Sequence, residues 1–201
     1  MIEIQNFGWN AITISAAINI LALILGAWGL HDQIKLMWKN GKTTTISTAL
    51  NIAYLGMFTA FVIYGFWLHS GALMIQLVRV ILLSVIIYGL IKFRGLSPRQ
   101  WLGLTLLTVG LIFMVALPYK EWFFLGFTIV GGVAAADQPF QIWKNKGHGM
   151  VSLKLIFVYA IGGAAWLVYG LILGKVFIAS MGLLYLILNS TSLVLSHIYR
   201  K

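Results

Sequence analysis

Residues 30–47, LHDQIKLMWKNGKTTTIS, return later in the chain as residues 135–152, AADQPFQIWKNKGHGMVS. Each stretch places an aspartate, Asp32 or Asp137, near the end of a long apolar run, although the chain has only four acidic residues. A carboxylate in the middle of a membrane helix costs about 2.5 to 3.5 kcal/mol on insertion scales, so such acids are rare. The recurrence of a costly residue at the same place indicates an internal duplication.

The similarity extends well beyond these two stretches. When the sequence is shifted by 105 residues, 12 of 40 ungapped positions are identical, and several of the shared residues are polar or aromatic. In the first copy the matching residues are Gly26, Asp32, Gln33, Trp38, Lys39, Asn40, Ser47, Leu50, Tyr54, Ala60, Tyr64 and Gly65. A shared apolar composition does not by itself produce polar matches of this kind. We therefore interpret the chain as two copies of one unit.

The composition is that of a membrane protein. Of the 201 residues, 61% are hydrophobic and only 9% are charged, well outside the range of soluble globular domains. Apolar segments of about 20 residues, long enough to cross a bilayer as a helix, recur between polar breaks. The unbroken apolar runs favour helices over the alternating strands of a membrane barrel. We predict seven helices, at residues 10–37, 47–68, 71–91, 99–117, 122–142, 151–173 and 176–196.

Because each copy holds an odd number of helices, two copies can point the same way only if an extra helix lies between them. The helix at 99–117, which is entered at Ser97-Pro98, supplies this inversion. The predicted fold is an all-α membrane protein in which two parallel three-helix repeats are joined by an inverting linker helix, an arrangement of repeats known in transporters. The predicted segments are 1–95 for the first repeat, 96–120 for the linker helix and 121–201 for the second repeat.

The net charge of +10 is interpreted as a topology signal. Eleven of the 14 basic residues follow odd-numbered helices, only Lys120 and Lys175 lie on the other side, and Arg79 lies inside a helix. The positive-inside rule then predicts an outside N-terminus and a cytoplasmic C-terminus. We expect membrane lipids as partners, with some contact to anionic lipids, and no nucleic acid. The eleven residues are Lys35, Lys39, Lys42, Lys92, Arg94, Arg99, Lys144, Lys146, Lys154, Arg200 and Lys201.

Each copy combines an Asp-Gln pair, a Trp-Lys pair and a short polar loop, and the second copy reads DQPFQIWKNKGHGMVSL, followed by WLVYG. In these motifs the chain resembles the PQ-loop superfamily, which includes the SWEET sugar transporters, cystinosin-like lysosomal exporters and many bacterial proteins. The resemblance covers nearly the whole chain and implies a seven-helix transporter of the bacterial type, in the inner membrane. Both copies depart from the family in having aspartate where it has proline before glutamine; the nearest proline is Pro139. The family's kinked helix implies that both helices run on through Trp38 and Trp143.

The two aspartates and the glutamines after them, Gln33 and Gln138, are the predicted proton-coupling or gating residues. A desolvated carboxylate in a cavity can exchange protons near neutral pH as water access alternates. The resemblance to proton-coupled family members supports this role. The alternatives are structural, because Asp32 lies three residues before Lys35, which suits an ion pair along one helix, and either acid can pair at a helix kink.

Arg79 is predicted to lie about halfway along the third helix, where an arginine needs an anion. One interpretation is a permanent salt bridge to Asp32 or Asp137 that fixes the helix packing. The other is a cavity cation that binds a carboxylate or phosphate of the substrate. Arg79 is therefore a candidate substrate-binding residue.

Trp166, Asn189 and Asn51 complete the set of candidate substrate-binding residues. The sugar-transporting relatives line their pocket with tryptophan and asparagine in the corresponding helices, so the resemblance implies a pocket role for Trp166 and Asn189. Packing against lipid is the alternative for Trp166, and a hydrogen bond between helices is the alternative for Asn189. Asn51 and Asn19 are further polar residues within apolar helices.

No catalytic or metal-binding pattern occurs in the sequence. No two histidines have metal-ligand spacing, no P-loop, HExxH or serine-hydrolase order is present, and the chain has no cysteine. His31 adjoins Asp32, but neighbouring helix positions point to different sides, so this pair is not expected to interact. We expect no enzyme activity, no metal and no cofactor.

The predicted function is alternating-access transport of a small polar solute, such as a sugar, an amino acid or a related metabolite, by two bundles that rock about a central site. Paired aspartates and a buried arginine favour a charged or zwitterionic solute, or proton coupling, over uniport of a neutral sugar. The alternative is a non-transporting membrane receptor or accessory protein on the PQ-loop scaffold. The solute, the direction of transport and the oligomeric state are left open by the sequence.

Overall fold

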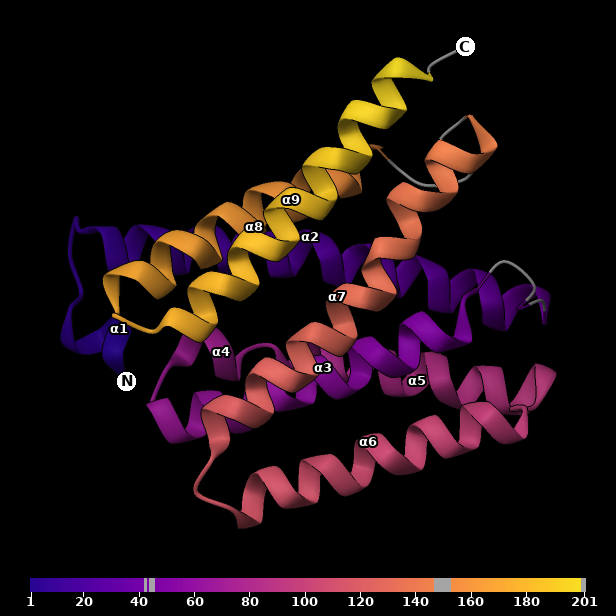
Figure 1. Cartoon of the computed structure of the whole chain (residues 1–201), viewed down its shortest axis with the longest axis horizontal. Helices are drawn as coiled ribbons and strands as arrows, with labels where there is room; N and C mark the ends of the chain where they lie inside the picture. Colours follow the sequence, from indigo (N-terminus) through magenta and orange to yellow (C-terminus); the bar gives the residue numbers. More distant parts are fainter. Residues whose placement is uncertain (42, 44–45, 147–152, 200–201) are drawn as a thin grey trace. The chain divides into compact units, whose positions relative to one another are not determined.

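The computed structural model describes residues 1–41, 43, 46–146 and 153–199, and this part of the chain is helical throughout its regular structure (Figure 1). Among the residues discussed above, Lys42, Arg200 and Lys201 lie outside the described residues, and the side chains of Asn40, Gln138 and Lys154 are not described either. The helices are α1 (Ile2–Gln5), α2 (Ala11–Asn40), α3 (Thr48–Leu68), α4 (Gly71–Met74), α5 (Leu77–Arg94), α6 (Pro98–Ala116), α7 (Lys120–Asn145), α8 (Leu153–Ile172) and α9 (Val176–Ile198).

The helices are long and apolar enough for an integral membrane protein. In the described part of the chain, six helical stretches meet the length and hydropathy needed to cross a bilayer, and α8 adds a shorter apolar stretch, Ile156–Ile172. The predicted all-helical membrane fold is therefore confirmed. The helices α2 and α7 continue through Trp38 and Trp143, and so run past the ends predicted from hydropathy.

Serine side chains cap the first turns of α3 and α6. Ser97 caps α6 by accepting a hydrogen bond from the backbone N–H of Gln100, and the Gln100 side chain accepts from the backbone N–H of Ser97. Together with Pro98 at the first helical position, this capping box fixes where α6 begins. Ser47 caps α3 in the same way, by accepting from the backbone N–H of Leu50.

The prediction of one unbroken helix at residues 71–91 is wrong, because the structure divides this segment into α4 and α5. At the break, Gln76 and Arg79 donate backbone hydrogen bonds three residues back rather than four, which is the tighter 3₁₀ pattern. The Gln76 side chain is fully buried there, and its Oε1 accepts a hydrogen bond of 3.2 Å from Arg79 Nη1. Arg79 consequently lies in the first turn of α5 and not midway along an unbroken helix.

The chain divides into two compact units, and each division falls inside a helix. Unit 1 contains Met1–Gly26 and Gly132–Lys201, and unit 2 contains Ala27–Gly131. The cuts after Gly26 and Gly131 lie 105 residues apart, which is the spacing of the sequence repeat. Unit 1 therefore contains the first half of α2 together with the second half of α7, α8 and α9. Unit 2 contains the second half of α2, the helices α3 to α6 and the first half of α7. The predicted segments 1–95, 96–120 and 121–201 concern the repeat and stay a prediction.

Unit 2 is built around α3, which packs against α4, α5 and α6. The beginning of α7 joins it through aromatic rings, since Phe124 lies 5.0 Å from Phe61 and 4.6 Å from Tyr64 between ring centroids. The end of α2 packs on α5 at Gly89, where an added Cβ would lie 2.2 Å from Met37 Cε. These contacts give unit 2 an aromatic core.

Unit 1 is built around α8 and α9, which lie side by side along their length (Figure 1). Small residues make this approach possible, because a Cβ on Gly163 would lie 2.6 Å from Leu186 N, and one on Gly182 would lie 2.2 Å from Leu167 N. Close backbone approach through glycine is a common way to pack membrane helices. The second half of α7 packs against α9 at Gly132, close to Leu184.

Candidate solute-binding residues

The second helix of each copy ends in a Tyr-Gly pair that has the same surroundings in both copies. A Cβ on Gly65 would lie 2.8 Å from the backbone N of Met74, and a Cβ on Gly170 would lie 2.3 Å from the backbone N of Ala179. Met74 and Ala179 are themselves repeat equivalents, 105 residues apart. Glycine at both positions therefore lets the following helix return closely against the preceding one.

The tyrosines before these glycines bind the two glutamates of the chain. Tyr64 and Tyr169 are both 0% exposed. The hydroxyl of Tyr64 donates to Glu121 Oε1 at 2.9 Å, and the hydroxyl of Tyr169 donates to Glu3 Oε1 at 2.5 Å. Each bond joins the second helix of one copy to a residue at or before the first helix of the other copy. We refer to these bonds as the two Tyr–Glu pairs.

The Tyr–Glu pairs were not found from the sequence. Tyr64 and Tyr169 match in the repeat, but Glu3 and Glu121 occupy different positions relative to their copies, so no sequence shift aligns them. One feature of the sequence could have indicated them: the chain has only four acidic residues, and both glutamates lie near the start of a copy. Of the four acids, Asp32 and Asp137 match at the repeat spacing, and Glu3 and Glu121 do not.

Asp32 and Asp137 lie on exposed surfaces of their own units. Asp32 Oδ1 lies 3.6 Å from His31 Nδ1, so the expectation that these neighbours do not interact is wrong; the two side chains turn back towards each other across one helix step. Asp137 Oδ1 accepts a hydrogen bond of 3.3 Å from Gln141 Nε2, one turn further along α7. Neither acid is buried within its own unit.

The remaining predictions for these acids are not tested by the geometry. Gln33 is half-buried beside Asp32, and the side chain of Gln138 is outside the described part. The ion pair of Asp32 with Lys35 and the proton-coupling role both stay predictions.

Arg79 is held by its own helix pair within unit 2. It is 7% exposed, Nη1 donates to Gln76 Oε1 at 3.2 Å, and the guanidinium carbon lies 4.8 Å from the centre of the Phe58 ring. A cation over an aromatic face is stabilised electrostatically. The substrate-binding and salt-bridge interpretations of Arg79 both stay predictions.

The two predicted asparagines use their amide groups within their own helices. Asn51 Nδ2 donates to the backbone carbonyl of Ser47 at 2.8 Å, and Asn189 Nδ2 donates to the backbone carbonyl of Tyr185 at 2.7 Å. Both residues are buried. Trp166 is also buried, and its ring meets the Tyr169 ring edge-on at 5.7 Å. Trp166 is thus linked through Tyr169 to Glu3.

Asn19 is the buried polar residue whose surroundings most need an explanation. It is 2% exposed, and neither Nδ2 nor Oδ1 has a hydrogen-bond partner among the residues that the structure describes. An unsatisfied buried amide costs about 1 to 3 kcal/mol, and such groups in native proteins commonly mark functional sites. Asn19 was only a minor candidate in the sequence, because position in an apolar run does not show whether an amide is satisfied.

The repeat relates Asn19 to an aromatic residue in the other copy. Its equivalent is Phe124, which packs on Phe61 and Tyr64 in unit 2. The equivalents of those two partners are Trp166 and Tyr169 in unit 1. Unit 1 therefore has an amide where unit 2 has a ring, so the two halves differ in polarity at equivalent positions. Asn19 joins Trp166 as a candidate for contact with a polar solute.

The described residues contain no group of three or more His, Cys, Asp or Glu residues that could hold a metal ion. The polar groups that the structure does provide are amides, an indole, tyrosine hydroxyls and carboxylates. Groups of this kind can donate or accept hydrogen bonds.

Comparison with known proteins supports the fold. No protein-family model matches the sequence, and no curated protein matches it. Among solved structures, the chain is similar to "The 3.7 A resolution structure of a eukaryotic SWEET transporter", with a TM-score of 0.73 and 16% sequence identity. The match covers 94% of this chain and 97% of that chain. The chain therefore has a SWEET-like fold.

Proposed function

We propose that this chain is a membrane transporter for a small polar solute. The observation that carries the proposal is the similarity to a SWEET transporter over nearly the whole length of both chains. Alternating-access transporters are commonly built from internal repeats of the kind that the sequence indicates here. The bacterial location, the outside N-terminus and the absence of enzyme activity are parts of the same proposal.

The proposed architecture is two parallel three-helix repeats joined by α6. Its support is the recurrence of matching features at the repeat spacing: the Tyr-Gly ends of α3 and α8, with both tyrosines bonded to a glutamate, and the unit borders after Gly26 and Gly131. The start of α6 at its capping box, after the third helix of the first copy, suits an inverting linker.

The proposed motion uses the two places where the chain passes from one compact unit to the other. Both lie within continuous helices, α2 after Gly26 and α7 after Gly131. If the units rock during transport, these helices bend at equivalent glycines. Glycine has the lowest intrinsic helix propensity after proline, which makes it a suitable point for bending.

The proposed solute contacts are Trp166, Asn189, Asn51, Arg79 and the newly favoured Asn19. Proton coupling is proposed for Asp32 and Asp137, because both carboxylates are exposed on their own units and can reach water in a hydrated cavity. Amides and an indole suit hydroxyl, amide or zwitterionic groups. The solute class is therefore small and polar, and a screen must identify it.

The test is a flux screen in liposomes that contain the purified protein, across sugars, amino acids and vitamins. We expect saturable uptake of one class down its gradient, and reduced uptake by the Trp166→Ala variant. Protein-free liposomes and the exposed-surface variant Phe113→Ala on α6 serve as controls. Saturable binding of a solute without any flux would instead identify a receptor on this scaffold.

A further inference from the structure

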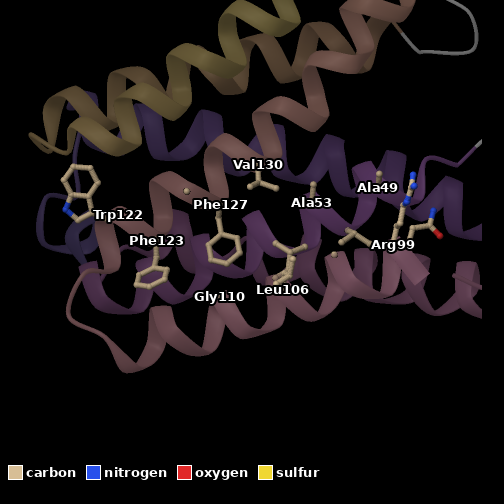
Figure 2. A pocket seen from close by; sticks show the side chains of 14 residues that line it. Ala49, Ala53, Arg99, Leu106, Gly110, Trp122, Phe123, Phe127 and Val130 are labelled. Carbon is tan, nitrogen blue, oxygen red and sulfur yellow. The ribbon is translucent and has the colours of Figure 1, made fainter. Parts of the chain in front are cut away.

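Unit 2 holds an apolar pocket of about 790 Å³ that is separate from the candidate solute contacts (Figure 2). It lies between α6 on one side and α3 and α7 on the other. Figure 2 shows Phe123 and Phe127 of α7 directed towards α6, opposite Leu106 and Gly110. The pocket exists because α6 is loosely packed: Met114 is the one residue of α6 that is buried.

The chemistry of the lining excludes a small polar solute as its occupant. Of the lining residues, Arg99, Gln100 and Trp122 are the ones with polar side-chain atoms. The Gln100 side chain is already used in the cap of α6, where it accepts from Ser97 N–H. Most of this lining offers a polar solute no hydrogen bonds to replace those that it makes to water, which is unfavourable.

The dimensions of the pocket suit a lipid tail. Arg99 and Trp122 lie at its two ends (Figure 2). From Arg99 to Gly110, α6 alone rises about 17 Å at about 1.5 Å per residue. Half of a hydrocarbon core of about 30 Å is about 15 Å, so the pocket extends at least as deep as one leaflet.

The charge at one end of the pocket suits an anionic headgroup. Arg99 lines that end and is exposed, and Arg94 at the end of α5 is exposed close by in sequence. Basic residues at a membrane surface attract anionic lipids. Trp122 is exposed at the other end, and tryptophan is enriched at membrane interfaces. The pocket is therefore apolar along most of its length and has a basic residue, Arg99, at one end.

We propose that this pocket binds one anionic phospholipid, with an acyl chain lying between α6 and α7 and the phosphate at Arg99. This site is independent of solute transport, so it can be tested whether or not the chain moves a solute. A bound lipid would fill the space between α6 and the rest of unit 2 and so hold the linker helix in place.

The first test is native mass spectrometry of the purified full chain with phosphatidylglycerol or phosphatidylcholine of the same acyl chains. We expect wild-type protein to retain one phosphatidylglycerol preferentially. Arg99→Gln should lower the affinity for phosphatidylglycerol about fivefold, the factor that corresponds to about 1 kcal/mol for one basic residue at an anionic surface, and leave phosphatidylcholine unchanged.

Two glycines allow the pocket itself to be filled. A Cβ on Gly103 or Gly126 would meet nothing within 4 Å, and both residues line the pocket. Gly103→Leu and Gly126→Leu should therefore place apolar atoms in the pocket and reduce retention of both lipids. Ala116→Leu, on an exposed part of α6 outside the pocket, is the matched control and should retain lipid as the wild type does.

A second measurement locates the lipid. Because the chain has no cysteine, a fluorophore can be attached at Leu107→Cys, a half-buried position that lines the pocket, or at Ile112→Cys on the exposed face of α6. Brominated phosphatidylglycerol as a minor lipid component should quench the label at position 107 more than the label at 112. Equal quenching at both positions, or unchanged lipid retention in both leucine variants, would overturn the proposal.

Discussion

At the residue scale, three buried asparagines that look alike in the sequence differ in whether their side-chain amides form hydrogen bonds. Asn51 and Asn189 are buried with their amides bonded inside their helices, whereas neither amide atom of Asn19 has a partner among the described residues. The sequence could place all three in apolar helices. It could not show which amide is left unpaired, because that depends on neighbours distant in the chain.

Asn19→Leu tests whether this amide is kept for function. Removing an unsatisfied buried amide should raise the stability of the protein by about 1 to 3 kcal/mol, measured as the midpoint of thermal or denaturant unfolding. The same variant should bind the transported solute more weakly, in keeping with the cost in stability that functional sites often carry. Asn51→Leu is the matched control, and it should lower stability because its amide is bonded. A less stable Asn19→Leu protein would show that the amide has a structural partner.

Asp137→Asn tests proton coupling at the same scale. We expect this variant to lose the response of solute flux to an imposed pH gradient, since an amide cannot exchange protons near neutral pH. Expression and solute exchange without a gradient should persist, because Asn keeps the hydrogen-bonding shape and accepts from Gln141 as Asp137 does. Flux should be followed as a function of the pH on each side of the liposome. Identical pH dependence in the variant and the wild type would remove the coupling role.

At the element scale, the two Tyr–Glu pairs attach the start of each copy to the second helix of the other. The sequence predicted the helices and most of their ends, because capping residues and apolar length are local signals. It did not predict these attachments, nor the break between α4 and α5. Both depend on contacts that the local pattern does not encode, such as the burial of Gln76 against Arg79.

The coupling within each Tyr–Glu pair can be measured by a double-mutant cycle. Tyr64→Phe and Glu121→Ala should each destabilise the protein, and the pair should show a coupling of about 0.5 to 3 kcal/mol. Tyr169→Phe with Glu3→Ala should give a coupling of similar size, because Tyr169 is also fully buried and also donates to a glutamate. Unfolding in detergent with increasing denaturant provides the measurement. Strictly additive effects would mean that the hydrogen bonds contribute nothing to stability.

A matched pair of glycine substitutions tests helix packing. In Gly182→Ala the new Cβ would lie 2.2 Å from the backbone N of Leu167, so α8 and α9 must separate, at a cost of about 1 to 3 kcal/mol. In Gly103→Ala the Cβ meets nothing within 4 Å, and better helix propensity should stabilise the protein by up to about 1 kcal/mol. Opposite shifts of the unfolding midpoint are expected. Shifts of the same sign would contradict the packing of α8 on α9.

At the scale of the whole molecule, the similarity to a SWEET transporter is the feature on which the proposed function depends. The membrane class and the positions of the helices followed from composition and apolar length, and the SWEET-like fold agrees with the resemblance in the repeated motifs. The division into units after Gly26 and Gly131 did not follow from the sequence. Hydropathy treats each first helix as one element, whereas the two halves of that helix belong to different compact units.

Counterflow is the most direct measurement of transport by such a chain. Liposomes that contain the purified protein are loaded with unlabelled solute and diluted into a trace of the labelled solute, with no other gradient imposed. We predict transient accumulation of label above its external concentration, because a site that faces each side in turn exchanges solute across the membrane. Solute that binds saturably to the protein but never accumulates inside the liposomes would contradict transport and identify a receptor.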